Sequence, residues 1–380
     1  MRQIAFVYHE FRKSCGVGRA LIEPLANLKR EYNITLIGQE FDGDLENKYN
    51  LVSIPKLSNS FIDKIIFPIK ASHYLKQHYF DLIHRQDSGF FNCDATTNQF
   101  LYLYWYHFVK EHCELFSSQF ASSVLKTAKS KYIQLTEKFQ YTDNHVRYVL
   151  SPSKMCHEQL QNYYGMPQDK IVAVTNGFNP AEFYPEGKVK EKLRKRYHLP
   201  QGVFIFLFSG SNYERKGLGV LLKAISILKA KEKDFRLLLV GFTEIGPLLP
   251  LIADLGVKDE IIFQGFSGQM SQIYHLADAF VLPAYYDPCP NSVYEAMASG
   301  LPVIISQNVG QSEWIVDGKT GLVIQNIFSV EELAGKLHLL MSNQRLREKV
   351  IVNASKKIGE FQWDKVSFRL IKLYNKLCPK

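Results

Sequence analysis

The stretch VFIFLFSGSNYERKGLGVLLKAISILKAKEKDFRLLLVG, residues 203–241, decides the fold class. It begins with an apolar run at 203–209 and continues through a loop of small and charged residues. Apolar residues then recur with helical spacing over 217–231, and a second apolar run follows at 236–241. Near-continuous apolar runs indicate strands buried on both faces, so the stretch predicts a strand–helix–strand unit of a parallel α/β sheet.

The same alternation extends in both directions along the chain. Further strands are expected at Ile4–Tyr8, Ile34–Gly38, Leu82–His84, Tyr148–Ser151, Ile261–Gln264, Ala279–Pro283 and Val303–Ser306. A length of 380 residues accommodates two domains of roughly 150 residues each. We therefore expect two Rossmann-like, doubly wound α/β domains, 1–184 and 185–360, that face each other across a cleft.

Composition and charge set broad limits on function. With 46% hydrophobic and 22% charged residues, the chain has ordinary globular composition and is neither disordered nor collagenous. The net charge of +9 suits an anionic ligand, a phosphate-bearing substrate or an anionic membrane surface without selecting one. No apolar stretch approaches 18 residues, and the start of the chain lacks the layout of a signal peptide. The six scattered cysteines predict free thiols, so we expect a cytoplasmic protein.

Two strand-to-helix turns carry residues suited to bind an anion. The first, Ser14–Arg19, places Gly16 at the start of a helix, where backbone N–H groups lack partners. The alternative is that it is only a tight turn. The second, which begins at Ser209 and Gly210, brings the adjacent cations Arg215 and Lys216 to a loop. Two fixed cations there would stabilise a diphosphate leaving group, whereas the alternative is a solvated charge pair.

A third segment, residues 286–303, combines two carboxylates with a helix start. Asp287 lies in a loop after a strand, and Glu295 lies in the following helix. The N–H groups of Asn291, Ser292 and Val293 lie between them. Carboxylates accept hydrogen bonds from sugar hydroxyls. The segment thus offers one carboxylate to each of two hydroxyl-bearing groups, and its amides suit an anion between those groups. Alone, Glu295 has the alternative reading of an acidic residue favoured by the helix dipole.

In order and spacing, these segments resemble the retaining glycosyltransferases of family four, which have the GT-B fold. The resemblance covers essentially the whole chain and also includes 175–179, 240–241, 263–266, Gly310, Glu313 and 317–321. The Arg-Lys-Gly pattern and Ala277-Asp278 are similar to the branch of lipopolysaccharide-core glucosyltransferases. In such relatives the C-terminal segment, here 361–380, is a helix that packs back onto the first domain.

The resemblance implies a hexose transfer from a nucleotide diphosphate sugar, with UDP-glucose favoured, to a hydroxyl of a glycan or lipid-linked glycan. It implies no cofactor and no metal, because cations and amides hold the diphosphate. The implied donor-binding residues are Gly16, Ser209, Gly210, Arg215, Lys216, Gly241, Phe266, Asp287, Asn291, Ser292, Val293 and Glu295. Among them, Glu295 would bind the ribose and Asp287 the transferred sugar. The implied catalytic residues are Arg215, Lys216, Asp287, Asp94 and Gln99.

The sequence departs from the family pattern at three places. Asp287 replaces the usual glutamate, Pro290 stands where glycine is common, and Gln99 stands where many relatives carry a histidine. Glutamine takes no proton at neutral pH and only orients a substrate. Asp94 is the nearest carboxylate in sequence and a candidate acceptor-side group, or else a helix or turn cap. In front-face attack the leaving phosphate takes the acceptor proton, so the family mechanism does not require the histidine.

Other features have more than one interpretation. The lysines and aromatic residues of Val124–Tyr141 are the better candidate for contact with an anionic membrane, whereas Phe100–Phe108 reads as a buried helix. We interpret His84 as a satisfied strand-end histidine and Asp42-Gly43-Asp44 as a surface turn rather than a metal motif. The stretch Glu186–His198 reads as a solvated basic helix.

Two further function classes were weighed against the enzyme. A non-catalytic nucleotide-sugar-binding protein or partner subunit is the alternative that Gln99 and Asp287 keep open. A nucleic-acid-binding protein has no support beyond the net charge, because no recognised binding module is present.

Overall fold

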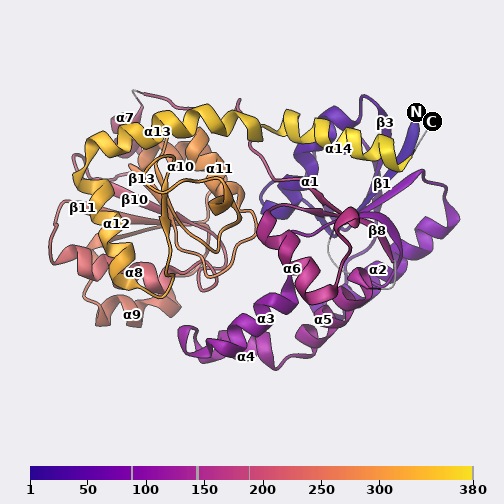
Figure 1. Ribbon diagram of the computed structural model, residues 1–380, viewed down its shortest axis with the longest axis horizontal. Helices are drawn as coiled ribbons and strands as arrows, with labels where there is room; N and C mark the ends of the chain where they lie inside the picture. Colours follow the sequence, from indigo (N-terminus) through magenta and orange to yellow (C-terminus); the bar gives the residue numbers. More distant parts are fainter. Residues whose placement is uncertain (87–88, 143–144, 188, 379–380) are drawn as a thin grey trace. The chain divides into compact units, whose positions relative to one another are not determined.

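The computed structural model describes residues 1–86, 89–142, 145–187 and 189–378, which form two compact units (Figure 1). Unit 1 comprises Met1–Asn176 and Trp363–Lys380, and unit 2 comprises Gly177–Gln362. The boundary expected after residue 184 therefore falls inside unit 2. Phe178 and Phe183 account for this difference, because both are buried in the core of unit 2.

Unit 1 is built on a seven-stranded sheet in which every paired neighbour is parallel. Its strands are β1 (Arg2–Val7), β3 (Tyr32–Gly38), β5 (Asn50–Ser53), β6 (Leu82–Gln86), β7 (Cys93–Thr97), β8 (Val146–Ser151) and β9 (Ile171–Ala173). The order β5-β3-β1-β6-β7-β8-β9 reverses direction between β1 and β6. A separate pair, β2 (Glu10–Phe11) and β4 (Glu40–Phe41), lies beyond the ends of β1 and β3. Ligands of doubly wound sheets bind at such a reversal.

Alternating side chains of β1 enter two different cores. Ile4 and Phe6 belong to the cluster covered by α1 (Gly16–Leu28) and α14 (Trp363–Leu377). Ala5 and Val7 face the opposite cluster, which α2 (Ser60–Gln77) covers. This period of two is what a sheet buried on both faces requires. The last helix of the chain, α14, packs against α1.

The aromatic run at 100–108 forms most of α3 (Tyr102–Glu111). Leu101, Trp105 and Val109, at a spacing of four residues, are buried, and most of the other positions are half-buried. The run is therefore a packed helix, in line with the interpretation given above. It is followed by α4 (Ser118–Leu125), α5 (Ala128–Tyr141) and, after β8, α6 (Lys154–Tyr164).

Unit 2 has a six-stranded parallel sheet in the order β12-β11-β10-β13-β14-β15, the strand order typical of dinucleotide-binding folds. Its strands are β10 (Phe204–Ser209), β11 (Phe235–Val240), β12 (Ile261–Gly265), β13 (Ala279–Leu282), β14 (Val303–Ser306) and β15 (Leu322–Ile324). Its helices are α7 (Lys190–Arg196), α8 (Leu218–Lys229), α9 (Leu249–Asp254), α10 (Met270–Leu276), α11 (Asn291–Ala298), α12 (Val330–Ser342) and α13 (Gln344–Ile358). The direction reverses between β10 and β13, so the candidate loops after those two strands lie beside each other.

The basic stretch Glu186–His198 is only partly the solvated helix that was expected. Arg194 is 5% exposed, and its Nη2 lies 2.6 Å from Asp278. Lys190 lies 2.7 Å from the same carboxylate. Burial acts to raise the pKa of Asp278, but the two cations outweigh burial and hold the pKa below its usual value. Asp278 is half-buried immediately before β13, and its carboxylate needs these cations, so Lys190 and Arg194 are not simply solvated.

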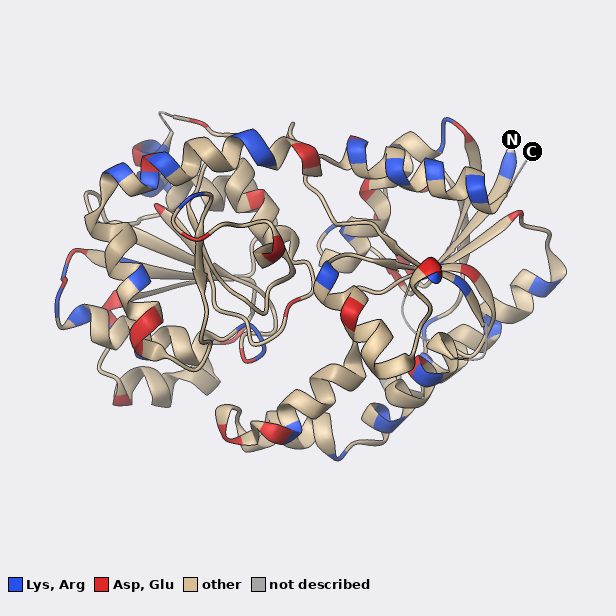
Figure 2. Ribbon diagram, in the orientation of Figure 1, with Lys and Arg blue, Asp and Glu red and all other residues tan. Residues whose placement is uncertain are grey.

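Three further sequence expectations bear on the surface and the thiols. All six cysteines are free. Asp42-Gly43-Asp44 forms a turn in which Asp42 accepts a hydrogen bond from the Lys13 N–H and Asp44 pairs with Lys48. Among the described residues, no helix combines the length and apolar character needed to span a membrane. Basic residues lie on helices of both units, including α5 and α14, rather than gathering in one unit (Figure 2).

Candidate functional site

In unit 2, two cations and one carboxylate meet at the carboxyl ends of β10 and β13. Arg215 Nη1 lies 3.3 Å and Lys216 Nζ 3.2 Å from Oδ2 of Asp287. All three side chains are largely buried. The structure therefore brings together the residues that the sequence singled out from two separate segments.

The loop before α8 takes this shape because two positions must be glycine. Gly210 has a φ of +157°, and a Cβ atom there would lie 2.2 Å from Cδ of Lys216. Gly217 has a φ of +76°, and a Cβ atom there would lie 1.9 Å from the Pro283 carbonyl oxygen. Both values fall in the region that favours glycine. These glycines let the Lys216 chain lie across the end of β10 and let α8 begin against the end of β13.

Asp287 is fixed by its backbone as well as by its side chain. Its N–H donates to the Asn308 carbonyl at 3.0 Å, and its carbonyl accepts from the Gly310 N–H at 3.0 Å. Burial alone would raise the pKa of the carboxyl group, but Lys216 and Arg215 outweigh burial and hold the pKa below its usual value. Asp287 is thus an anion that keeps both cations in place, with one positive charge left over for the three groups.

Helix α11 begins next to this cluster and carries the second carboxylate. Its first turn holds Asn291, Ser292 and Val293, and no side chain in the described part of the protein caps its N-terminus. The Ser292 hydroxyl oxygen is buried and has no hydrogen-bond partner among the described residues. Glu295 is buried, and its Oε2 accepts a hydrogen bond of 2.8 Å from the Tyr274 hydroxyl. Tyr274 was not expected at this site, because it lies in α10, 21 residues before Glu295, and nothing in the sequence links the two residues.

The other expected donor-binding residues of unit 2 lie at the same edge of the sheet. Ser209 ends β10, Gly241 follows β11, and Phe266 follows β12. Gly241 has a φ of +103° and packs against the backbone of Gly210. The Phe266 ring is 60% exposed, so its face is available to a planar ligand group. The roles of these residues toward a donor stay predictions.

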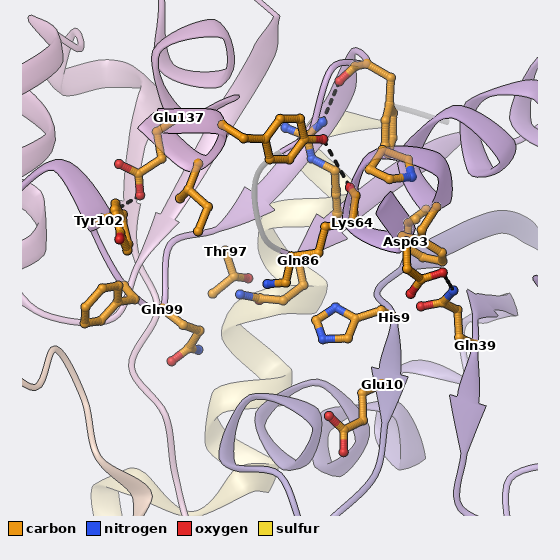
Figure 3. A pocket seen from close by; sticks show the side chains of 18 of the residues that line it. His9, Glu10, Gln39, Asp63, Lys64, Gln86, Thr97, Gln99, Tyr102 and Glu137 are labelled. Atoms are coloured by element: carbon orange, nitrogen blue, oxygen red, sulfur yellow. Dashed lines mark hydrogen bonds between the residues drawn. The ribbon is translucent and has the colours of Figure 1, made fainter. Parts of the chain in front are cut away.

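Unit 1 holds a cavity of about 400 Å³ at the carboxyl ends of β1, β3, β6 and β7 (Figure 3). His9 and Gln39 reach it from the loops after β1 and β3, and Gln86 and Thr97 reach it from the ends of β6 and β7. Apolar and aromatic side chains form much of its wall: Phe67 and Pro68 from α2, Phe91 and Phe100, and Tyr132, Ile133 and Tyr141 from α5. The cavity lies at the reversal of strand order, where a ligand of this sheet is expected.

Gln99 lies at the rim of this cavity and is held by another amide. Its Nε2 donates to Oδ1 of Asn176 at 2.8 Å, and Nδ2 of Asn176 donates to Oε1 of Gln99 at 3.0 Å. This reciprocal pair fixes the orientation of the Gln99 side chain. Asn176 belongs to the 175–179 segment that the resemblance included, but its partner could not be inferred from spacing.

Asp94 lies at the opposite end of β7 and does not line the cavity. Its Oδ2 accepts a hydrogen bond of 2.9 Å from the Ile83 N–H, and its Oδ1 lies 3.1 Å from Arg147. The carboxylate thus joins β6 to β7 at their amino ends. The acceptor-side role expected for Asp94 is not retained, because side chains at this end of a parallel sheet are remote from the ligand edge.

His84 is a satisfied core histidine. Its Nδ1 shares a hydrogen bond with the Tyr374 hydroxyl of α14, and its Nε2 lies 2.8 Å from Oγ1 of Thr97. Complete burial lowers the pKa of His84 to about 3, so the ring is neutral near pH 7. Gly16 is the first residue of α1, and its role toward a diphosphate stays a prediction.

Sequence reasoning missed the polar floor of the unit 1 cavity. Arg85 and Gln86 end β6, immediately after the residues that the sequence predicted as a strand, and both are nearly completely buried. Two consecutive polar residues at the end of a buried strand were the available signal. The aromatic residues of α5 were also misjudged, because Tyr141 is buried and Tyr132 lines the cavity.

Two family models match successive parts of the chain, the first mainly unit 1 and the second unit 2. The model for Glycosyltransferase Family 4 matches residues 15–182, and the model for Glycosyl transferases group 1 matches residues 189–357. These matches agree with the two Rossmann-like sheets and the site described above. Together they identify the class of the protein as a glycosyltransferase with two Rossmann-like domains. The chain belongs to glycosyltransferase family 4 and has the GT-B fold.

Curated relatives match over part of their length. An uncharacterised glycosyltransferase of Methanocaldococcus jannaschii is 27% identical over 60% of this chain and 59% of its own. A D-inositol 3-phosphate glycosyltransferase of Thermomonospora curvata is 26% identical over 57% of this chain and 54% of its own. The chain thus spans a little more than half of these relatives.

Solved structures match over nearly the whole chain but at low identity. WaaG, a glycosyltransferase involved in lipopolysaccharide biosynthesis, has a TM-score of 0.84 at 18% identity, covering 99% of this chain and 100% of its own. HepE of Anabaena, solved with UDP-glucose, has a TM-score of 0.76 at 15% identity with the same coverage. At these identities the likeness establishes the fold alone.

Proposed function

We propose that the protein transfers a hexose from a nucleotide diphosphate sugar to a hydroxyl of a glycan or lipid-linked glycan, with retention at the anomeric carbon. The observation that carries this proposal is the cluster of Arg215, Lys216 and Asp287 beside the N-terminus of α11. The cluster has a net positive charge and lies next to the N-terminus of α11, whose dipole also favours an anion, so it suits a diphosphate. Glu295 and Asp287 offer carboxylate oxygens to hydroxyls on either side of it.

In the proposed reaction, the bond between the anomeric carbon and the phosphate oxygen breaks, and a bond to the acceptor oxygen forms on the same face. The acceptor proton passes to the leaving phosphate oxygen, so no protein base is needed. Arg215 and Lys216 stabilise the negative charge that grows on the diphosphate as it leaves. Asp287 holds these cations before the donor arrives, so little reorganisation accompanies the reaction.

UDP-glucose is the donor we favour. HepE, which shares the fold, was solved with UDP-glucose. The exposed ring of Phe266 and the buried pair of Glu295 and Tyr274 suit a base and a ribose, respectively. We further propose a cytoplasmic protein that touches the inner face of the membrane through exposed lysines of α5 and its N-terminal flank.

The alternative is a nucleotide-sugar-binding protein without turnover. The observation that favours it is the pairing of Gln99 with Asn176, because neither amide takes a proton. Release of UDP from UDP-glucose, with and without an acceptor, separates the two functions.

The experiment combines binding with turnover. UDP-, GDP- and ADP-glucose are compared by thermal shift, and released nucleotide is then measured with candidate acceptors. Stabilisation by UDP-glucose together with UDP release supports the enzyme. Tight binding without release by any acceptor favours the binding protein, and the absence of any nucleotide-dependent shift contradicts both functions.

A further inference from the structure

The floor of the unit 1 cavity contains a buried cation that has no counter-ion among the described residues. Arg85 is 2% exposed, and its Nη1 donates to the carbonyls of Gly89 at 2.8 Å and Phe91 at 2.7 Å. Its Nε and Nη2 have no hydrogen-bond partner among the described residues. No carboxylate of the described residues forms an ion pair with Arg85. Burying an unpaired charge is costly, so this guanidinium favours an incoming anion.

The acidic residues of the cavity do not fill that role. Four line it, and three of them have other partners. Glu137 accepts the N–H groups of Tyr102 and Leu103 at the start of α3. Asp63 accepts hydrogen bonds from Gln39 and from the Leu57 N–H, and Glu40 pairs with Arg12 and Lys56. These contacts fix the wall of the cavity and leave Arg85 as its unmatched buried charge.

The donors that remain on Arg85 have a defined geometry. The two carbonyls accept hydrogen bonds from Nη1. The edge of the guanidinium formed by Nε and Nη2, whose N–H bonds point in the same direction, therefore remains for a ligand. Such a planar fork matches the two oxygens of a carboxylate or phosphate. The next residue, Gln86, is also nearly buried, and both its amide oxygen and nitrogen have no partner among the described residues. Figure 3 places the Gln86 side chain between His9 and Thr97.

We infer that this cavity selects an acceptor that carries an anionic group, a carboxylate or a phosphate, which Arg85 pairs and Gln86 orients. The aromatic wall covers the apolar faces of the acceptor ring or its aglycone. This inference rests on the proposed function in taking the ligand to be the acceptor. The anion requirement itself is a property of unit 1 and is measurable without donor or turnover.

The test uses the full chain and matched acceptor analogues. Binding of p-nitrophenyl glucuronide, p-nitrophenyl glucose 6-phosphate and neutral p-nitrophenyl glucoside is measured by calorimetry. We expect one of the two anionic compounds to bind at least about tenfold more tightly than the glucoside, which identifies carboxylate or phosphate as the preferred group. Arg85→Gln should remove this preference by weakening the binding of the anionic compound at least about tenfold more than that of the glucoside.

Two controls keep the result interpretable. Arg147→Gln removes one exposed positive charge of unit 1 outside the cavity and should preserve the preference. Because UDP binds at unit 2 in the proposed function, the folding of unit 1 in Arg85→Gln is checked by circular dichroism and by hydrogen exchange of the unit 1 strands. If that variant does not fold, Gln86→Met should reduce the preference instead. Equal affinity for all three compounds, or equal losses for charged and neutral compounds in Arg85→Gln, overturns the inference even where UDP-glucose binds. Failure of UDP-glucose to bind counts against the proposed function alone.

Discussion

The two units differ in whether the cations at their ligand edges are paired with a carboxylate. Both sheets reverse strand order between the first and fourth strands along the chain, so both place loops at equivalent positions. In unit 2, that edge holds Arg215 and Lys216 already paired with Asp287. In unit 1, it holds a cavity of about 400 Å³ above Arg85, which has no carboxylate partner among the described residues. The same type of sheet thus holds a preorganised charge cluster in unit 2 and a cavity with an unpaired cation in unit 1.

This difference suggests a division of labour. A cluster that must stabilise growing charge is most effective when it is rigid before the reaction, and Asp287 supplies that rigidity. A pocket that must distinguish one acceptor from another gains specificity from a buried group that only the right ligand satisfies. Changes in unit 2 should therefore reduce turnover, whereas changes in unit 1 should alter which acceptor is used.

The largest expected effect comes from Lys216→Ala. Removing one of the two cations should lower kcat by about 100- to 1,000-fold, because charge on the leaving diphosphate loses a buried partner. UDP release from UDP-glucose measures this loss. Lys223→Ala, on the exposed face of α8, is the matched control and should retain wild-type kinetics. Unchanged turnover in Lys216→Ala would remove this lysine from the site and leave unit 2 without its proposed function.

The next effect comes from Glu295→Gln, which keeps the size of the side chain and removes its charge. Loss of a hydrogen bond to a charged group should weaken UDP binding by about 1.5–3 kcal/mol, roughly 10- to 150-fold. Tyr274→Phe removes the hydroxyl that donates to Glu295 and should have a smaller effect in the same direction. Calorimetry with UDP measures both. Equal affinities in Glu295→Gln and wild type would contradict the ribose role.

Mild acid should weaken unit 1 more than unit 2, because nothing opposes the lowering of the His84 pKa by burial, whereas Glu186 opposes the lowering that burial causes at His275 of unit 2. An unfolded histidine binds a proton below about pH 6.5, whereas burial lowers the pKa of folded His84 to about 3. Between these values the unfolded state binds more protons, so stability falls as pH falls. The loss for His84 is about 2 kcal/mol at pH 5. Asp287, whose pKa is held below its usual value, loses its contribution only below about pH 4.

Hydrogen exchange at pH 7 and pH 5, corrected for the intrinsic rate, checks this order unit by unit. Protection of β6 and α14 should fall at pH 5 by more than that of β10 and β13, which is affected only through His275. His84→Gln should lower stability at pH 7 but flatten the dependence between pH 7 and pH 5. His157→Gln, which replaces a half-buried histidine on α6, should leave the pH dependence of stability unchanged. A parallel loss in both units would contradict the assignment to His84.

The contrast between the units also explains what the sequence could predict. The paired strands and helices follow from near-continuous apolar runs, and nine expected strands coincide with β1, β3, β6, β8 and β10–β14 to within a few residues. Four strands of the two large sheets, β5, β7, β9 and β15, were missed. NLVS and CDATT mix polar with apolar residues, and IVA and LVI are only three residues long. The candidate residues of unit 2 lie at the end of β10, in loops or in α11, and the glycines and charged residues among them are visible in the sequence.

The unit 1 cavity could not be inferred in the same way. Its lining comes from at least five separate segments, and most of its members are ordinary core or loop residues until the fold brings them together. Asp94 shows the limit most clearly. It was chosen for its nearness to Gln99 in sequence, but β7 separates the two and places them at opposite ends of the sheet. Nearness in sequence predicts nearness at a site only within one loop.

The smallest effect per residue concerns the surface beside the cavity. Lys126, Lys129 and Lys131, on α5 and its N-terminal flank, are exposed, and Leu135 on α5 is 60% exposed. Replacing the three lysines by glutamine should reduce association with vesicles that contain anionic lipid by about 1 kcal/mol per lysine. Co-sedimentation at low and physiological salt measures the change, and the difference between wild type and variant should narrow as salt rises.

The matched control replaces Lys223, Lys231 and Lys233, three exposed lysines of unit 2, with glutamine. If both triple variants lose association equally, net charge rather than the α5 surface governs the contact, because the two variants carry the same charge. If only the α5 variant loses it, unit 1 combines the acceptor pocket with the membrane surface, as a lipid-linked acceptor would require.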